Sequence, residues 1–228
     1  IVNEERQSLA GTFSLGILPT IAPYLLPRFF TRLQREHPEA DIRVMEMKTA
    51  DIKRALNRGE LDAAILVSLD DMDHYVQTPL FYEQFLAYVS RGDALFSHKA
   101  IKTSDLNNEF LWLLEEGHCF RDQLVKFCQL KSADSSKKTY SLGSIETFMR
   151  MVEGGQGVTF IPELALEQLS PAQHELVRPF ALPIPVREVV LLTTRAFVRH
   201  SVLNLIADAV RRSVPQRMLQ FNNTEQRV

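Results

Sequence analysis

Apolar positions in the first third of the chain follow the periods of strands and helices in turn. Strands are predicted at Thr12–Leu18, Asp41–Met47 and Leu61–Ser68, and helices at Tyr24–Pro38 and 49–60. Thr49 is a suitable N-cap for the second helix, and Gly59 would end it. Leu61–Ser68 is almost wholly apolar, as expected for a strand covered on both faces. The order β-α-β-α-β predicts a parallel sheet with right-handed crossovers.

The rest of the chain continues these patterns. Strands are predicted at 76–81, 84–90, Phe110–Glu115, 137–143, Gly157–Pro162 and 188–195, and helices at Phe120–Leu130, 144–155 and Ser201–Met218. We therefore expect an α/β protein with two Rossmann-like lobes. The lobes would be joined by two crossover segments near Phe81–Tyr88 and Leu182–Glu188.

Composition excludes several classes of protein. The net charge of −2 does not predict nucleic-acid binding by the chain as a whole, and 45% apolar residues suffice for a core. No apolar run is long enough to predict a membrane span, which needs about 18 residues. The first residues, IVNEERQSLAG, show no apolar signal region, so we expect a cytoplasmic protein. Two cysteines in 228 residues do not predict a disulfide scaffold.

Both cysteines lie in one short stretch, GHCFRDQLVKFC. Cys119 precedes the predicted helix 120–130, where the partial positive charge of a helix N-terminus favours thiolate. His118 and Arg121 can add positive charge, and Asp122 can orient a donor. Nine helical steps separate Cys119 from Cys128 by roughly 13 Å, on opposite faces. A disulfide needs Cα atoms within about 7 Å, so this pair could form one only if the helix unwound.

Other interpretations of the cysteines remain open. Free cysteines are commonly buried as small apolar residues; Cys128 fits that description, whereas Cys119, at a polar loop edge, fits it poorly. The spacing lacks the C-x₂₋₄-C pattern of zinc sites, and we expect no metal and no cofactor. Predicted strand ends at Thr20, Thr49 and 117–119 offer groups that could hold a small polar or anionic ligand.

Four segments carry a family resemblance: GILPTIAPYLLPRF, EMKTADIKRALNRGELDAAIL, GGQGVTFIPELA and LEEGHCFRDQLVKFC. Together they resemble the regulatory domain of LysR-type transcription regulators, and the last one resembles the hydrogen-peroxide sensors among them. The resemblance implies a periplasmic-binding-protein type 2-like fold. It also implies that Cys119 is the peroxidatic cysteine and Cys128 the resolving cysteine. Residues implied to line the peroxide pocket are Thr20, Thr49, His118 and Asp122. Arg187 lies near the position of an arginine involved in activation.

The resemblance also implies a domain organisation and a set of partners. Residues 1–10 would end a linker helix, 11–83 and 187–228 would form lobe I, and 84–186 would form lobe II with the cysteines. Peroxide would oxidise Cys119 to a sulfenic acid, and a Cys119–Cys128 disulfide would then remodel the helix and change dimer packing. The implied partners are a second copy in dimers and tetramers, RNA polymerase, and DNA bound through a helix-turn-helix domain absent from this chain. The implied outcome is activation of antioxidant genes, without enzymatic activity.

Three alternatives involve other functions. A LysR-type effector domain could bind a small metabolite without redox chemistry, and Cys119 would then be a bystander. A thiol peroxidase would turn over peroxide with a reductant. A switch that rebuilds a helix in every cycle suits stoichiometric sensing better than such turnover. A solute-binding protein shares the two-lobe plan, but the chain shows no signal region.

Overall fold

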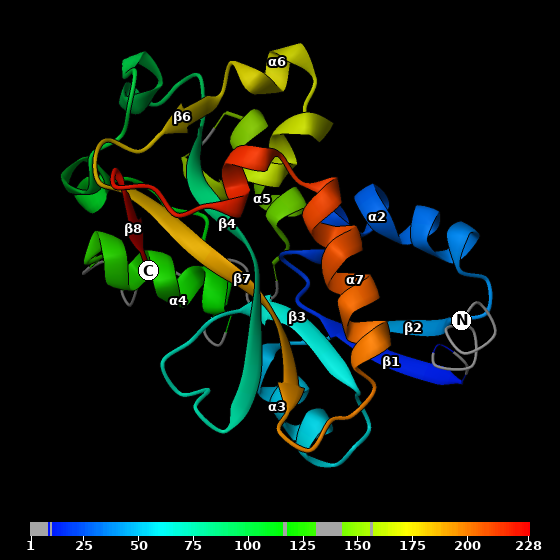
Figure 1. Ribbon diagram of the computed structural model, residues 1–228. Coiled ribbons are helices and arrows are strands. Elements are labelled where there is room, and N and C mark those ends of the chain that lie inside the picture. Colours follow the sequence, from blue (N-terminus) through cyan, green and yellow to red (C-terminus); the bar gives the residue numbers. More distant parts are fainter. Residues whose placement is uncertain (1–8, 10, 116–117, 131–142, 156) are drawn as a thin grey trace. The chain divides into compact units, whose positions relative to one another are not determined.

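The computed structural model describes residues 9, 11–115, 118–130, 143–155 and 157–228. Strands and helices alternate along these residues in a mixed α/β fold (Figure 1). The chain divides into two compact units. Unit 1 contains Ile1–Tyr82 and Glu188–Gln220, and unit 2 contains Glu83–Arg187 and Phe221–Val228. The chain passes from one unit to the other three times: within β4 (Tyr75–Val89), within β7 (Ile184–Thr194) and after Gln220.

Unit 1 is built around a central strand with a parallel neighbour on each side. Its elements are β1 (Thr12–Ile17), α2 (Ala22–Glu36), β2 (Asp41–Glu46), α3 (Thr49–Asn57), β3 (Ala63–Val67), α7 (His200–Ser213) and the short 3-10 helix η5 (Gln216–Leu219). Strand β1 pairs in parallel with β2 and β3, and β3 pairs antiparallel with β7. Helices α2 and α7 lie side by side (Figure 1). The predicted β-α-β-α-β order is confirmed, and β3 is buried at every position, which explains its apolar run.

The ends of three helices in unit 1 differ from the prediction for local reasons. Helix α2 begins two residues before Tyr24, because Pro23 suits a first turn. The prediction of Thr49 as an N-cap is wrong by one position: Lys48 has the extended backbone of the cap, and Thr49 is the first helical residue. Helix α7 ends at Ser213 rather than Met218, because Pro215 disfavours helical backbone at Val214.

Unit 2 combines antiparallel strands with short helices. Its elements, besides its parts of β4 and β7, are η1 (Ala94–Ser97), η2 (Thr103–Asn108), α4 (Cys119–Cys128), α5 (Ile145–Glu153), β5 (Val158–Pro162), η4 (Glu163–Gln168), α6 (Pro171–His174), β6 (Val177–Pro179) and β8 (Glu225–Arg227). Strand β4 pairs antiparallel with β5 and β6. The first residues of β7 pair in parallel with β8.

Four predicted strands in this part of the chain need comment. The segments 76–81 and 84–90 are one continuous strand, β4, and not two. Phe110–Glu115 is not a strand: Leu111 makes a single bridge to Val158, with hydrogen bonds only at Phe110 and Trp112. Its apolar residues reflect packing, because Leu111, Trp112 and Leu114 are all buried. The strand predicted at 137–143 lies outside the described residues, except Gly143.

The assignment of residues 187–228 to a single lobe is wrong for its last part. Phe221–Val228 belongs to unit 2 because β8 pairs with β7 at Ile184–Val186. The linker helix predicted for residues 1–10 lies outside the described residues, apart from Leu9, which is helical and buried.

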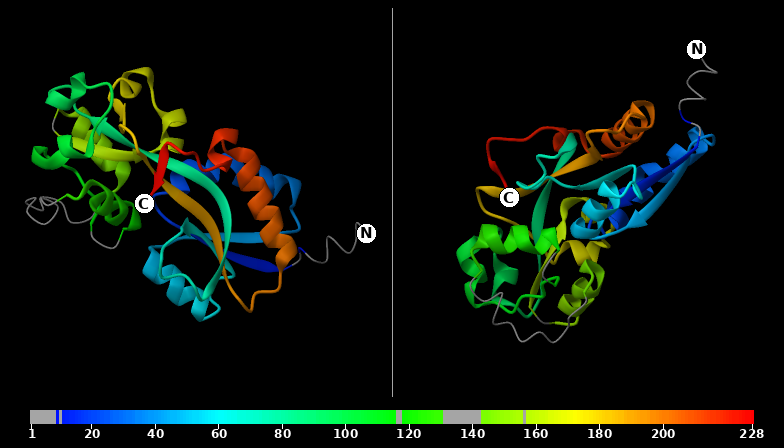
Figure 2. Two further views of the ribbon diagram at one scale, coloured as in Figure 1. Left: turned by 60° about the vertical axis from the view of Figure 1, so that its left-hand side comes forward. Right: turned by 90° about the horizontal axis from the view of Figure 1, so that it is seen from below.

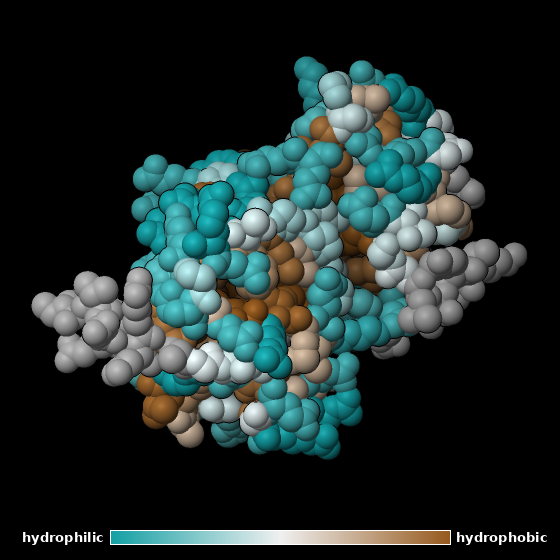
Figure 3. All heavy atoms as spheres, turned by 90° about the vertical axis from the view of Figure 1, so that its right-hand side faces the viewer, coloured by the Kyte–Doolittle hydropathy of each residue, from teal (hydrophilic) through white to brown (hydrophobic). Residues whose placement is uncertain are grey.

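Burial follows the apolar pattern in both units. Figure 3 shows one face, on which hydrophilic side chains cover most of the surface and hydrophobic side chains are visible mainly in recesses. In unit 1 the core includes Phe13, Leu15 and Ile17 of β1, each at most 1% exposed. Within the part of the chain that the structure describes, no helix combines the length and the apolar character needed to cross a membrane.

Candidate functional site

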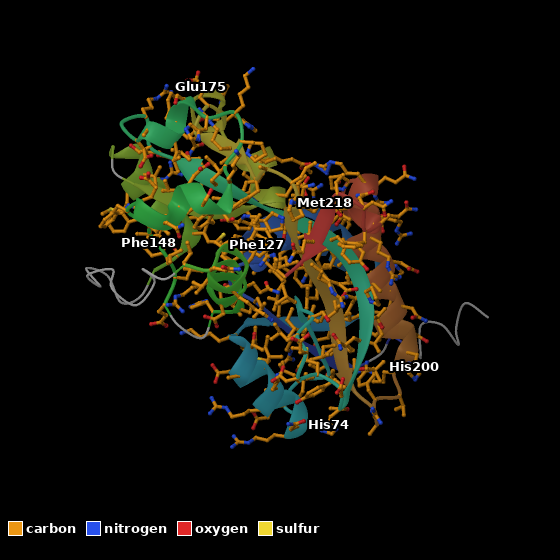
Figure 4. All side chains as sticks on the ribbon, turned by 90° about the vertical axis from the view of Figure 1, so that its left-hand side faces the viewer. His74, Phe127, Phe148, Glu175, His200 and Met218 are labelled. Carbon is orange, nitrogen blue, oxygen red and sulfur yellow. The ribbon has the colours of Figure 1, made fainter. Side chains whose placement is uncertain are left out.

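Helix α4 begins with one cysteine and ends with the other. Cys119 is its first residue and Cys128 its last, and both are free thiols. The prediction that both cysteines share one helix is confirmed. Because nine helical steps span roughly 13 Å, the intact helix keeps the two sulfur atoms too far apart for a disulfide. Figure 4 shows this helix with Phe127, whose ring packs edge-to-face on Phe180.

The two thiols are both shielded from solvent. Cys119 is 8% exposed and Cys128 is 3% exposed. Cys119 lies at the boundary between a loop and a helix, beside polar residues, as expected, but it is buried, and the expectation that it would fit a buried cysteine poorly is wrong. Helix α4 turns its buried face, which includes Phe120 and Leu124, towards the interior of unit 2, and Cys119 is covered with them.

Polar residues surround the first turn of α4. His118 is the N-cap, with extended backbone, and its main-chain oxygen accepts a hydrogen bond from the Asp122 main-chain nitrogen at 3.1 Å. The His118 ring lies 3.9 Å from the Glu115 carboxylate, and its side chain is 12% exposed. The Arg121 guanidinium donates to the Asp122 carboxylate at 3.1 Å. The structure therefore brings His118, Cys119 and Asp122 together at one helix end, and it directs the charge of Arg121 to Asp122.

The last turn of α4 is apolar. Burial raises the pKa of the Cys128 thiol to about 12, so this thiol is neutral at physiological pH while the helix is intact. A neutral thiol is a poor nucleophile. Gln129 closes the helix in the left-handed backbone conformation, with φ of 50°.

A buried ion pair packs against the first turn of α4. The Arg187 guanidinium donates to Glu83 Oε2 at 2.8 and 2.7 Å, and both side chains are 1% exposed. The guanidinium carbon also lies 5.0 Å from the centre of the Phe120 ring. The Phe85 ring lies on Phe120 as well, with ring centres 4.8 Å apart. The residue after Cys119 is thus held by two residues from β4 and β7.

Sequence reasoning missed part of this arrangement. It singled out Arg187 but gave it no partner, and it did not name Glu83 or Phe85. A charged residue inside each of two apolar strands was the available signal, because buried charges require partners. Nothing in the sequence indicated that these two residues, 104 positions apart, would pair.

Thr20 and Thr49 belong to unit 1. Thr20 lies three residues after the end of β1 and is 5% exposed, and Thr49 begins α3 three residues after the end of β2. Because β1 and β2 are parallel neighbours, the two threonines lie at the same edge of the sheet of unit 1. Their approach to Cys119, which belongs to unit 2, stays a prediction.

The described residues contain no group of three or more histidine, cysteine or acidic side chains that could hold a metal ion. Helix α4 itself offers two free thiols, one buried beside polar groups at its start and one at its far end, and a disulfide between them would need a rearrangement of the helix.

Comparisons with known proteins agree with this view of the fold. A family model described as the LysR substrate binding domain matches residues 6–215. The "Hydrogen peroxide-inducible genes activator" of Dickeya chrysanthemi is 30% identical over 211 residues, covering 92% of this chain and 69% of the relative. The crystal structure of OxyR from Porphyromonas gingivalis is 46% identical with a TM-score of 0.88, over 95% of this chain and 99% of that one. The structure of reduced OxyR from the same organism is 45% identical with a TM-score of 0.86, over 95% and 100%.

These likenesses confirm the predicted fold class, a periplasmic-binding-protein type 2-like α/β fold. They also connect the chain to transcription regulators whose names refer to hydrogen peroxide. Because the family match covers residues 6–215 of a chain of 228, the chain belongs to the LysR substrate-binding domain family.

Proposed function

We propose that this chain is the redox-sensing domain of a LysR-type transcription activator whose signal is hydrogen peroxide. The observation that carries the proposal is the position of Cys119 and Cys128 at the first and last residues of α4. The relatives named as peroxide-inducible activators and as reduced OxyR support it.

The proposed reaction has two steps. The Cys119 thiolate sulfur attacks one oxygen of hydrogen peroxide, the O–O bond breaks, and hydroxide leaves and is protonated to water. Cys119 is then a sulfenic acid. The Cys128 sulfur attacks the Cys119 sulfur, the S–O bond breaks, and a second water leaves as the disulfide forms. Two thiols are oxidised by two electrons, and one peroxide molecule is reduced to two waters.

The side chains around Cys119 have assigned roles in the proposal. His118, Asp122, Thr20 and Thr49 line the peroxide pocket, and the hydroxyl groups of the two threonines hold the peroxide oxygens. Cys119 acts as the peroxidatic and Cys128 as the resolving residue. Since burial raises the pKa of Cys128 to about 12, its thiolate forms readily only after α4 opens. Opening of the helix therefore has two effects: it brings the sulfurs within reach and it activates Cys128.

The disulfide converts a local reaction into a change of packing. The remodelled segment 119–128 alters contacts between copies in a homodimer or tetramer, and a helix-turn-helix domain outside this chain transmits the change to DNA and RNA polymerase. Cellular thiols reverse the reaction in the cytoplasm. The domain senses peroxide stoichiometrically, so a steady-state assay with a thioredoxin system should show no sustained turnover.

The test is intact mass spectrometry with thiol trapping on reduced protein, before and after about one equivalent of peroxide. We expect the loss of two trappable thiols and a mapped Cys119–Cys128 bridge. Cys119→Ser should abolish the response, and Cys128→Ser should stop it at the sulfenic acid or higher acids. Survival of both thiols at micromolar peroxide would exclude the proposal.

The burial of both thiols favours a second candidate, a metabolite-binding LysR-type domain in which the cysteines only pack. Tight binding of a small anion by calorimetry, together with thiols inert to peroxide, would support that candidate instead.

A further inference from the structure

The segment Phe221–Val228, here called the strap, runs beside the redox helix. Its strand β8 extends the sheet of unit 2 in parallel with β7, as Figures 1 and 2 show. The Ile184 main-chain nitrogen donates to the Thr224 oxygen at 2.9 Å, and the Val228 nitrogen donates to the Val186 oxygen at 3.1 Å. The strap is thus fastened to a strand that runs through the core.

A side-chain contact fastens the strap to a second strand. Gln84 of β4 donates from its amide nitrogen to Glu225 Oε1 at 3.2 Å. The other Glu225 oxygen accepts the Asn222 main-chain N–H at 2.9 Å, which closes a turn within the strap. The strap therefore has a defined position, held on one side by β7 and on another by β4.

From this position the strap reaches the middle of α4. The Gln123 side chain donates from its amide nitrogen to the main-chain oxygen of Val228 at 2.8 Å. Gln123 is 6% exposed, so water does not easily replace this bond. It lies four residues after Cys119 and five before Cys128, so a segment that rearranges to join the cysteines must move Gln123 and break the contact.

The second polar atom of the Gln123 side chain has an opposite effect on the helix. Among the described side chains, Gln123 Oε1 is a buried polar atom with no hydrogen-bond partner. A buried acceptor without a partner destabilises the conformation that contains it. Helix α4 is thus restrained at Gln123 by one hydrogen bond while it carries an unsatisfied atom in the same side chain.

We propose that the strap holds α4 in its helical form through Gln123, and that this contact sets how readily the segment opens after Cys119 is oxidised. Gln123 is a positioning residue: it does not meet peroxide, and it acts through the helix. This inference rests on the proposed function for its redox consequence, whereas the restraint on α4 can be measured without peroxide.

The first part of the test is hydrogen exchange of reduced protein, read by mass spectrometry on peptides that cover 120–128. Gln123→Ala removes the contact from the helix side, and Val228→Pro removes the Val228–Val186 bond without altering α4. Gln226→Ala is the matched control, because the Gln226 side chain is exposed on the same strap. Loss of one hydrogen bond should speed opening of α4 roughly two- to tenfold in Val228→Pro and not in the control. The acceleration should be smaller in Gln123→Ala, because this variant also removes the unpaired buried Oε1 atom. Alanine favours helix, so faster exchange in Gln123→Ala cannot reflect a loss of helix propensity.

The second part separates the two redox steps by stopped peroxide reactions with thiol trapping. In Gln123→Ala and Val228→Pro, the rate of sulfenic acid formation at Cys119 should match that of the unmodified chain. Disulfide formation in each variant should accelerate by the factor by which its hydrogen exchange in α4 accelerates. A purely structural role would instead raise exchange throughout unit 2, and this result would overturn the proposal.

The outcomes for the strap and for the redox function are distinguishable. Unchanged exchange of α4 in both variants overturns the strap, even if the unmodified chain forms its disulfide. Faster exchange of α4 supports the strap as a restraint, and absence of a disulfide in the unmodified chain would then reject the redox function alone. If Gln123→Ala fails to fold, Val228→Pro decides, because its change lies outside the helix.

Discussion

The buried pair of Glu83 and Arg187 should be essential to the stability of unit 2. Glu83→Gln preserves the shape of the side chain and an oxygen for the Leu164 N–H, which donates to Glu83 Oε1 at 3.0 Å. It removes the negative charge, and it places an amide nitrogen, which cannot accept a hydrogen bond, where the second carboxylate oxygen accepts from Arg187. The Arg187 guanidinium, at 1% exposure, then loses its buried ion pair with Glu83.

The expected cost follows from this burial. Removal of one partner of a buried ion pair typically costs about 3–5 kcal/mol. Exposed pairs are worth about 0–1 kcal/mol, and Arg91 and Glu175 form such a pair, with side chains 55% and 60% exposed. Glu175→Gln is therefore the matched control. At a urea dependence of about 2 kcal/mol per M, a loss of about 4 kcal/mol lowers the unfolding midpoint by roughly 2 M.

The assay is urea unfolding followed by tryptophan fluorescence. The chain has one tryptophan, and Trp112 lies in unit 2, so its emission reports the unit that contains the pair. Adding Arg187→Met to Glu83→Gln should recover much of the loss, because an apolar side chain needs no counter-ion. A cost below about 1 kcal/mol for Glu83→Gln, or a double variant no more stable than the single one, would refute the reasoning.

The remaining predictions concern three positions, Cys128, Gly157 and Ser144. In Cys119→Ser, the alkylation rate of Cys128 should keep rising about tenfold per pH unit above pH 9 and up to about pH 12, because burial raises its pKa to about 12; a plateau near the ordinary thiol value of about 8.5 would contradict this. The raised pKa also means that the neutral Cys128 thiol gives helical α4 its full stabilisation below about pH 8.5, and that this stabilisation is lost as pH rises towards 12. Circular dichroism of the same variant should detect the resulting loss of helix. Gly157→Ala should destabilise unit 2 by more than about 1–2 kcal/mol in urea unfolding, since Gly157 has φ of +76° and an added Cβ would lie 2.5 Å from the Phe110 oxygen; Gly59→Ala, with φ of +68° and no atom within 4 Å, is its control. Ser144→Ala should cost about 1 kcal/mol, since the Ser144 hydroxyl accepts the Thr147 N–H at 3.1 Å and caps α5; an unchanged midpoint would show that this cap contributes little.

Local patterns in the sequence were sufficient for most elements of the fold. Strands β1, β2, β3 and β5 and helix α4 follow from periodicity, because each buries one face or both at regular intervals. Phe110–Glu115 was mistaken for a strand because packing alone can make a segment apolar. The position of Phe221–Val228 could not be predicted, since β8 pairs through main-chain groups whose partner, β7, lies about 40 residues earlier.

In the candidate site, too, local features could be predicted from the sequence and contacts between distant residues could not. The cysteine spacing predicted the conflict between helix and disulfide, because helical rise is a local property. The burial of Cys119 and the pairing of Arg187 with Glu83 depend on contacts between distant parts of the chain, which no local pattern encodes. The approach of Thr20 and Thr49 to Cys119 stays a prediction for the same reason.

Helix α4 has ten residues, and isolated helices shorter than about 12–15 residues are marginal in water. Its helical state is therefore conferred by neighbours such as Phe85 and Val228, which carry no reactive group. Under the proposed function, the peroxide dose at which the domain responds is a property of these neighbours as much as of the thiols. Related domains could then differ widely in sensitivity while keeping both cysteines, and their thresholds would be found by comparing what packs on the helix.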